Sequence, residues 1–356
     1  PPPPPPPPPT PPLLCYRRQR QMCIRDRVKL VDAYPEEKQV WMQDYMEDKN
    51  QILNLYNTVT KEISNKINVF LTPEEQRLLA KTRTVNREAY DAYLKSLHFL
   101  EDFSAESLNK AMDFLNSAID KDPDWAMLYA SRAKVWMGLQ QMGQESPTIA
   151  GPQLFENLNK ALELDPDLAE AYFMKAMIAY LAEWDWDKSE KEFVRSLALN
   201  PSDALGRIYY AQLLVILNRP QEARAQGELA MDIDPLNPLA QVIYSALLVM
   251  LRDCKRAMQQ VEKLLKDDPG NFIANNALFH AAYPCKDYDK TFKTLRNLLP
   301  HSYPLRDEVW NEIDEIYDLQ GFVPAFKEIT RYLEIYSNNN TVAAFEMVYL
   351  NIFADK

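Results

Sequence analysis

Hydrophobic residues along most of the chain recur at the three- and four-residue spacing of amphipathic helices. In the segment "LFENLNKALEL" (154–164), for example, Leu158, Ala161 and Leu162 fall on one helical face. Alternation of apolar and polar residues, which is typical of half-buried strands, does not occur in the sequence after residue 90. The pattern therefore predicts a mainly α-helical fold, with no strand beyond that point.

The segment before the helical region has a different pattern. Residues 28–33 and 38–46 are rich in β-forming residues and are separated by "PEE" (35–37), which predicts a β-hairpin. Apolar residues at helical spacing then predict a helix up to residue 67, and "LTPEEQRLLAK" (71–81) predicts another helix, capped by Thr72. Because a hairpin and one helix are not stable alone, we expect 28–70 to be the end of an α/β domain, joined to the repeats by a linker helix within 71–85.

A proline motif recurs along the helical region. The strings "DKDP", "ELDP", "ALNP", "DIDP" and "KDDP" end at Pro123, Pro166, Pro201, Pro235 and Pro269, and the last three intervals between these prolines are nearly equal. Since the residue before a proline is pushed out of the α region, each string should end a helix. A polar capping residue should then start the next helix, and the candidates are Asp124, Asp167, Ser202, Asn237 and Asn271.

Small residues recur with the same period. Ala133, Ala176, Ala211 and Ser245 would lie on the first helices of successive units, and Ser189, Ala223 and Ala257 on the second helices. Small side chains allow two helices to approach closely, so these positions should form the contact between the helices of each pair.

A period of about 34 residues with two helices per unit resembles the tetratricopeptide repeat, or TPR. The resemblance implies a right-handed TPR α-solenoid of about seven helical hairpins, preceded by the truncated β-hairpin and helix. Within an array at 86–337, the hairpins would span 86–121, 124–164, 167–199, 202–233, 236–267, 270–299 and 304–336. The second would contain an insertion at 140–153, which accounts for the longer first interval, and a capping helix at 341–353, within 338–356, would end the array.

Residues 1–27 do not resemble a folded segment. Nine prolines precede "RRQRQMCIRDR" (17–27), which, written back into DNA, resembles a transposase-based sequencing adapter. The alternative is a genuine arginine-rich arm. We interpret 1–27 as an artefact that would be disordered, and we expect a longer natural protein to precede Val28.

The charge of the remaining chain excludes some partners. The sequence has 40 basic and 51 acidic residues, and removing the five arginines and one aspartate of 1–27 leaves a net charge of −15. So acidic a chain should repel nucleic acids and anionic membranes. No run approaches eighteen apolar residues, so we expect no transmembrane helix in this segment.

Several segments resemble a bacterial family in which a TolB-like α/β domain precedes a TPR array. They are "VKLVDAYPEEKQVWMQDY", "LTPEEQRLL", "VNREAYDAYLKS" and "EWDWDKSEKEFVRSLALNPSDAL", and the resemblance covers residues 28–270. In that family this part often follows an adenylate cyclase, a winged-helix regulator or a protein kinase. The resemblance implies a regulatory role and leaves a cytoplasmic or a periplasmic location open.

Trp184 and Trp186, on either side of Asp185, fall at a turn between two predicted helices. They could anchor a ligand at the rim of a binding surface. We favour the alternative, in which both fill the bend of the helical hairpin.

The sequence contains no recognisable catalytic or metal-binding motif. His98, His280 and His301 belong to different units, and no phosphate-binding or nucleophile motif is present. We therefore predict no cofactor, no metal and no enzyme activity. A disulfide between Cys254 and Cys285 is conceivable, but two buried free thiols are the favoured interpretation.

The concave face of such an array offers a binding surface for a peptide or a partner helix. First helices line that face, and three cationic residues on them would suit a ligand with carboxylates. The candidate partner-binding groove residues are Tyr129, Arg132, Trp136, Tyr172, Lys175, Arg207, Tyr210 and Gln241. The alternative is a regulatory half of a signalling protein.

Overall fold

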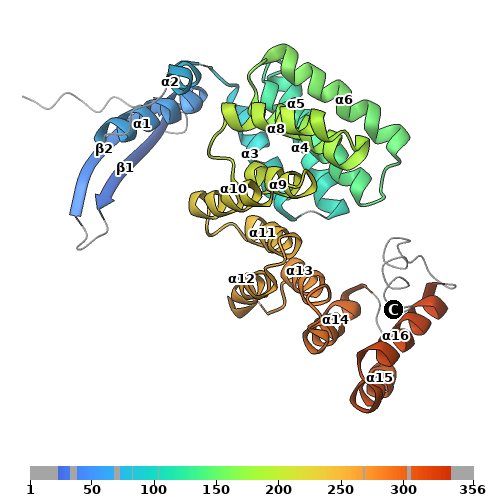
Figure 1. Ribbon diagram of the computed structural model, residues 1–356. Coiled ribbons are helices and arrows are strands. Elements are labelled where there is room, and N and C mark those ends of the chain that lie inside the picture. The colour runs from blue at the N-terminus through green and yellow to red at the C-terminus, as the bar shows by residue number, and fades with distance from the viewer. Residues whose placement is uncertain are drawn as a thin grey trace, which may run out of the picture. The chain divides into compact units, whose positions relative to one another are not determined.

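The computed structural model describes residues 23–32, 38–67, 73–81, 83–102, 104–267, 269–302 and 306–337 (Figure 1). Internal contacts divide the chain into two compact units, 1–178 and 179–356. The predicted turn at 35–37, the cap Thr72 and the capping helix at 341–353 lie outside the described residues.

The first unit begins with the predicted β-hairpin. Strands β1 (Cys23–Asp32) and β2 (Lys38–Asp48) pair antiparallel, and helix α1 (Ile52–Lys66) follows them. β1 starts five residues earlier than predicted, so the expected disorder of 1–27 is wrong for residues 23–27. Pairing with β2 gives these residues backbone partners, and Arg27 forms an ion pair with Asp44 (Nε to Oδ1, 2.6 Å).

A short helix connects this part to the repeats. α2 (Pro73–Ala80) carries Arg77, which pairs with Asp167 at 2.9 Å, and it is followed by Lys81, which pairs with Asp165 at 2.7 Å. Hydrogen bonding to Arg77 lowers the pKa of Asp167. These contacts attach the linker segment to the turn that contains Pro166.

Consecutive helices of the first unit pack against one another. They are α3 (Arg87–Asp102), α4 (Ala105–Lys121), α5 (Ala126–Gln141), α6 (Pro147–Leu164) and α7 (Ala169–Ile178). The longer interval between Pro123 and Pro166 is absorbed by the connection between α5 and α6 and by the length of α6.

The second unit continues the same arrangement. A π-helical turn (Ala179–Glu183) leads to α8 (Trp186–Leu199), and the remaining helices are α9 (Ala204–Ile216), α10 (Pro220–Ile233), α11 (Pro238–Met250), α12 (Cys254–Asp267), α13 (Phe272–Ala282), α14 (Tyr288–Ser302), α15 (Asp307–Gln320) and α16 (Phe322–Ser337). The fold is mainly α, as predicted, and past residue 48 the described segments contain helices, turns and loops but no strand.

The recurring small residues are buried as predicted. Ala133, Ala176 and Ala211 on first helices, and Ser189, Ala223 and Ala257 on second helices, are fully buried. Ser245 donates a hydrogen bond from Oγ to the carbonyl oxygen of Ala257 over 2.9 Å, which joins α11 to α12. The small side chains are therefore buried, and Ser245 lies where the two helices of its pair meet.

The helix caps agree with the prediction at two of the positions. Asn237 and Asn271 accept hydrogen bonds from the backbone N–H three residues later. Ser202 and Asp124 are not the caps. The helices start one residue further along, so Asp203 caps α9 through Gly206 N and Trp125 precedes α5 without a side-chain cap.

Candidate protein-binding surface

All eight predicted groove residues lie on first helices, but the division of the chain separates them. Tyr129, Arg132, Trp136, Tyr172 and Lys175 belong to the first unit, on α5 and α7. Arg207, Tyr210 and Gln241 belong to the second unit, on α9 and α11.

Four of these residues, Tyr129, Tyr172, Arg207 and Gln241, occupy one position of the repeat, the sixth residue after the recurring proline, and the last three donate to the carbonyl oxygen of that proline. Tyr172 donates from Oη to the carbonyl oxygen of Pro166 at 2.9 Å, Arg207 donates to that of Pro201 at 2.7 Å and 3.0 Å, and Gln241 to that of Pro235 at 2.7 Å. Each side chain thus closes the turn that leads into its own helix.

Asn275 makes the same contact, although the sequence reasoning missed it. Its Nδ2 donates to the carbonyl oxygen of Pro269 at 3.0 Å. The signal that could have found it is its place one repeat period after Gln241, because only the position, and not the residue type, recurs. A tyrosine, an arginine, a glutamine and an asparagine all supply a donor of suitable reach.

Arg132 also forms hydrogen bonds within its own unit. Its Nε donates to Oδ1 of the buried Asn157 on α6 at 2.6 Å, and its second nitrogen donates to Asn116 on α4 at 3.1 Å. The guanidinium lies 5.4 Å from the centre of the Tyr129 ring. Burial lowers the pKa of Arg132, which reflects the loss of water around the charge.

Trp136 and Lys175 complete the group in the first unit. Trp136 is half-buried and packs against the cores on both sides of α5. The Lys175 ammonium lies 5.5 Å from the centre of the Tyr172 ring. The charges of Arg132 and Lys175 are therefore placed over aromatic rings of their own helices.

Tyr210 joins a first helix to the preceding second helix. Its hydroxyl donates to Glu190 on α8 at 2.9 Å, and Glu190 also pairs with Arg219. Burial, together with the hydrogen bond to Glu190, raises the pKa of Tyr210 to about 12. The tyrosine is 8% exposed, so it contributes to the packing of the unit.

A different set of first-helix side chains is open to solvent. Leu239 on α11 and Ile273 on α13 are each 46% exposed, and Leu205 on α9 is half-buried. All three are the fourth residue after a recurring proline, so they lie in equivalent places on helices that pack side by side. Ile216, eleven residues after Leu205 and on the same face of α9, is 43% exposed. These four exposed or half-buried apolar residues are called the apolar row below.

The turns between the two helices of a hairpin share an unusual backbone conformation. Trp184, Asn218, Arg252 and Lys286, which recur at the period of the repeat, have φ between 57° and 61°. This left-handed region costs a residue with a side chain roughly 1 kcal/mol, and asparagine tolerates it best. Trp184 is 71% exposed, so the prediction that it fills the bend is wrong. Trp186 is half-buried.

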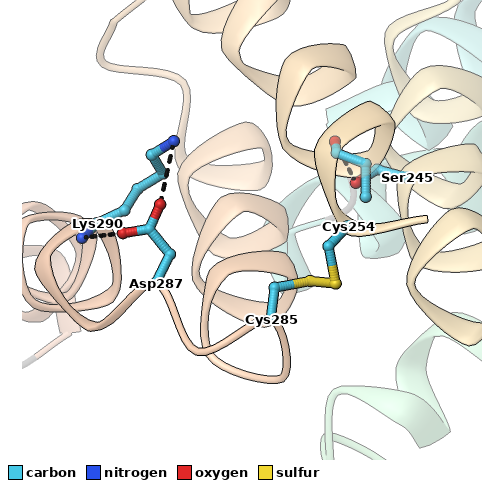
Figure 2. The surroundings of a disulfide bond; sticks show 6 residues. Ser245, Cys254, Cys285, Asp287 and Lys290 are labelled. Atoms are coloured by element: carbon cyan, nitrogen blue, oxygen red, sulfur yellow. Dashed lines mark hydrogen bonds and ion pairs between the residues drawn. A yellow bond between two sulfur atoms is a disulfide. The ribbon is translucent and has the colours of Figure 1, made fainter. Parts of the chain in front are cut away.

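A disulfide joins the start of one helix to the turn before another. Cys254, the first residue of α12, is bonded to Cys285 in the turn before α14, with Cα atoms 5.6 Å apart (Figure 2). The prediction of free thiols is therefore wrong. Cys254 lies two residues after the left-handed Arg252 and Cys285 one residue before the left-handed Lys286, so the side-by-side packing of α11 and α13 brings the two sulfurs together.

The described residues give no sign of a metal centre or of a membrane-spanning helix. Among them, no three His, Cys, Asp or Glu side chains gather closely enough to hold a metal ion. Within the same residues, no helix combines the length and the apolar composition needed to cross a bilayer.

No protein-family model and no curated protein matches this sequence. Solved structures with similar folds include yeast Tom70 (20% identity, TM-score 0.46, covering 70% of this chain and 53% of that one) and a tetratricopeptide repeat protein from Parabacteroides merdae (12%, 0.43, 76% and 100%). The Cut9–Hcn1 complex is another (14%, 0.49, 85% and 53%). The chain therefore has a mainly α helical-repeat fold, whose repeat spacing and paired helices are like those of tetratricopeptide repeats.

Proposed function

We propose that the chain is a non-catalytic scaffold that binds a peptide or a helix of another protein, and that the ligand lies on the apolar row. The observation that carries this proposal is the exposure of Leu239, Ile273 and Ile216 on helices that pack side by side. Isolated exposed leucines are ordinary, but a row repeated on successive helices suits the apolar face of an amphipathic helix.

The composition of the first helices supports an apolar ligand rather than one rich in carboxylates. α11 contains no acidic or basic residue, and α13 contains only His280 among titratable side chains. Arg207, the charged residue of α9, donates to Pro201 and Gln226. The binding role of the eight residues predicted from the sequence stays a prediction. Five of them form internal hydrogen bonds, which makes these five the weaker candidates: Arg132, Tyr172, Arg207, Tyr210 and Gln241.

A photo-crosslinker placed at Leu239 tests the apolar row. We expect covalent adducts with the partner from Leu239 and Ile273 and none from Leu229, which is 42% exposed on the second helix α10. In the matched experiment, the purified chain is used to capture the cross-linked partner. The double variant Leu239→Glu with Ile273→Glu should abolish this capture, and Leu229→Glu should leave it unchanged. Equal adducts from Leu229 would contradict the proposal.

The groove residues predicted from the sequence need a separate test. If Tyr172→Ala, Lys175→Ala and Arg207→Ala together abolish capture while thermal unfolding shows an intact fold, the ligand surface lies on those residues instead. Unchanged capture by this triple variant would support the apolar row.

A regulatory role in a signalling protein is the second candidate. It is favoured by the ion pairs that Arg77 and Lys81 make with Asp167 and Asp165, because they connect the segment after the β-hairpin to a turn of the array. The TolB-like family remains part of this proposal. Sequencing the natural gene upstream of Val28 tests it, and a cyclase, kinase or winged-helix segment there would support it.

A further inference from the structure

The turn at Trp184 differs from the three equivalent turns in the residue that it holds. Asn218, Arg252 and Lys286 are polar, whereas Trp184 places a large aromatic side chain in the same left-handed conformation. Bulky residues are disfavoured in this region. Since Trp184 is 71% exposed, burial does not compensate for the strain. The three equivalent turns show that this conformation does not require a tryptophan, so a strained tryptophan here is a reason to look for a function.

The neighbours of Trp184 form an aromatic cluster. The rings of Trp184 and Trp186 are 5.7 Å apart and inclined by 54°, and the Trp186 ring is 5.9 Å from that of Tyr180. Trp186 and Tyr180 are half-buried, so they support an exposed ring from one side. Tyr180 belongs to the π-helical turn at Ala179–Glu183, a distortion that is frequent at functional sites.

The charges around this cluster are predominantly negative. Glu183, Asp185 and Asp187 alternate with the two tryptophans along the chain. Glu183 neutralises Lys188 at 2.6 Å, and Asp185 caps α8 by accepting a hydrogen bond from the backbone N–H of Lys188. Asp187 is exposed and forms no ion pair with another residue in the described segments.

We propose that Trp184 and Trp186, with Asp187 beside them, bind a cationic side chain, arginine or lysine, on a partner protein. The face of an indole ring attracts a guanidinium or an ammonium group, and tryptophan does so best among the aromatic residues. The carboxylates add a favourable field, and the acidic chain attracts basic partners over longer distances. This site lies at the turn between two helices and is independent of the apolar row.

Binding of a tetra-arginine peptide, measured by titration at low salt, tests the proposal. A tetra-citrulline peptide is the matched probe, because citrulline keeps the shape of arginine without its charge. We expect the wild-type chain to prefer tetra-arginine and Trp184→Ala to weaken that binding by about 5-fold, within the roughly 2- to 30-fold range of a cation–π contact. Asp187→Asn should weaken it by about 2-fold.

Leu236→Ala is the control variant, since Leu236 is 81% exposed and has no part in the cluster. It should bind both peptides as the wild-type chain does, and Trp184→Phe should keep part of the affinity. Thermal unfolding of Trp184→Ala should be unchanged, so a loss of binding reports the site. Equal binding of the two peptides, no measurable binding of tetra-arginine, or unchanged affinity in Trp184→Ala would each overturn the proposal.

Discussion

The first and second helices of the hairpins at 202–233 and 236–267 differ in where they place charge. The second helices carry acidic and basic side chains along their outer faces, among them Glu222, Arg224 and Glu228 on α10 and Lys255, Arg256 and Glu262 on α12. α9 has one charged residue, Arg207, and α11 has none. Even so, Ile216 and Leu239 remain more than 40% exposed on these first helices.

This difference in charge indicates what the layer of first helices and the layer of second helices each do. A helix with one apolar stripe and one charged face packs against a core and meets water, which describes α10 and α12. A helix that is apolar on nearly all sides needs a second apolar neighbour. On the apolar row, side chains of α9 and α11 remain exposed, and in the proposed binding mode a partner protein supplies the second apolar neighbour.

The disulfide should have the largest effect on how the first helices are held. It joins the first residue of α12 to the turn after α13 and closes a loop with a sequence separation of 31 residues (Figure 2). Cys254→Ser should lower the free energy of unfolding by about 2–4 kcal/mol. Urea unfolding of the variant and of the oxidised and reduced wild-type chain measures this, and no difference between the two wild-type forms would show that α11 and α13 are aligned by packing alone.

Overpacking the contact between the first and second helices should have the second largest effect on stability. Ala223 on α10 is fully buried, so Ala223→Leu should cost about 1–3 kcal/mol of unfolding free energy. The matched control is Leu229→Ala on the same helix, at an exposed position, which should change little. An unchanged unfolding midpoint in Ala223→Leu would mean that α10 does not face α9 through this residue.

The repeat period explains why the layers could be predicted and the ligand surface could not. Ala211, Ala223 and Ser245 recur at fixed spacing because sterics dictate a small residue at each helix contact, so the sequence alone locates those contacts. Nothing comparable dictates the residue type at the sixth position after the proline. Tyr172, Arg207 and Gln241 resembled ligand-binding residues because polar and aromatic side chains on a first helix suggest recognition. Their internal hydrogen bonds depend on the turn geometry.

The disulfide and the exposure of Trp184 were misjudged for a related reason. Cys254 and Cys285 meet only when the turn conformations place one before and the other after the left-handed residue. Trp184 was expected to fill the bend, as large aromatic residues usually do. A backbone φ of 57° instead directs it to solvent, and a positive φ is hard to anticipate for tryptophan.

The bond between Tyr210 on a first helix and Glu190 on a second helix gives a pH test of the contact between layers. Because the pKa of Tyr210 is raised to about 12, the folded state keeps the proton longer than the unfolded state, whose tyrosines titrate near 10. This contribution is complete below pH 10 and is lost as the pH rises towards 12. Tyr210→Phe should cost about 1 kcal/mol at pH 8 and less at pH 11.

Urea unfolding of both proteins at the two pH values measures that difference. Tyr288→Phe, at a position 42% exposed, is the control and should behave as the wild-type chain at pH 8. A cost of Tyr210→Phe that is equal at pH 8 and pH 11 would show that the hydroxyl does not link the two layers.

The outer charges should matter least to stability. Glu228 on α10 pairs with Arg256 on α12 at 3.1 Å, and the two side chains are 46% and 47% exposed. An ion pair this open to water contributes little, so Glu228→Gln should change the free energy of unfolding by under about 0.5 kcal/mol. Urea unfolding in low and high salt checks this, with Ala223→Leu as the reference for a buried position on the same helix. A loss comparable to that of Ala223→Leu would mean that the charged face of the second helices also holds successive repeats together, and the contrast with the first helices would then be one of composition and not of role.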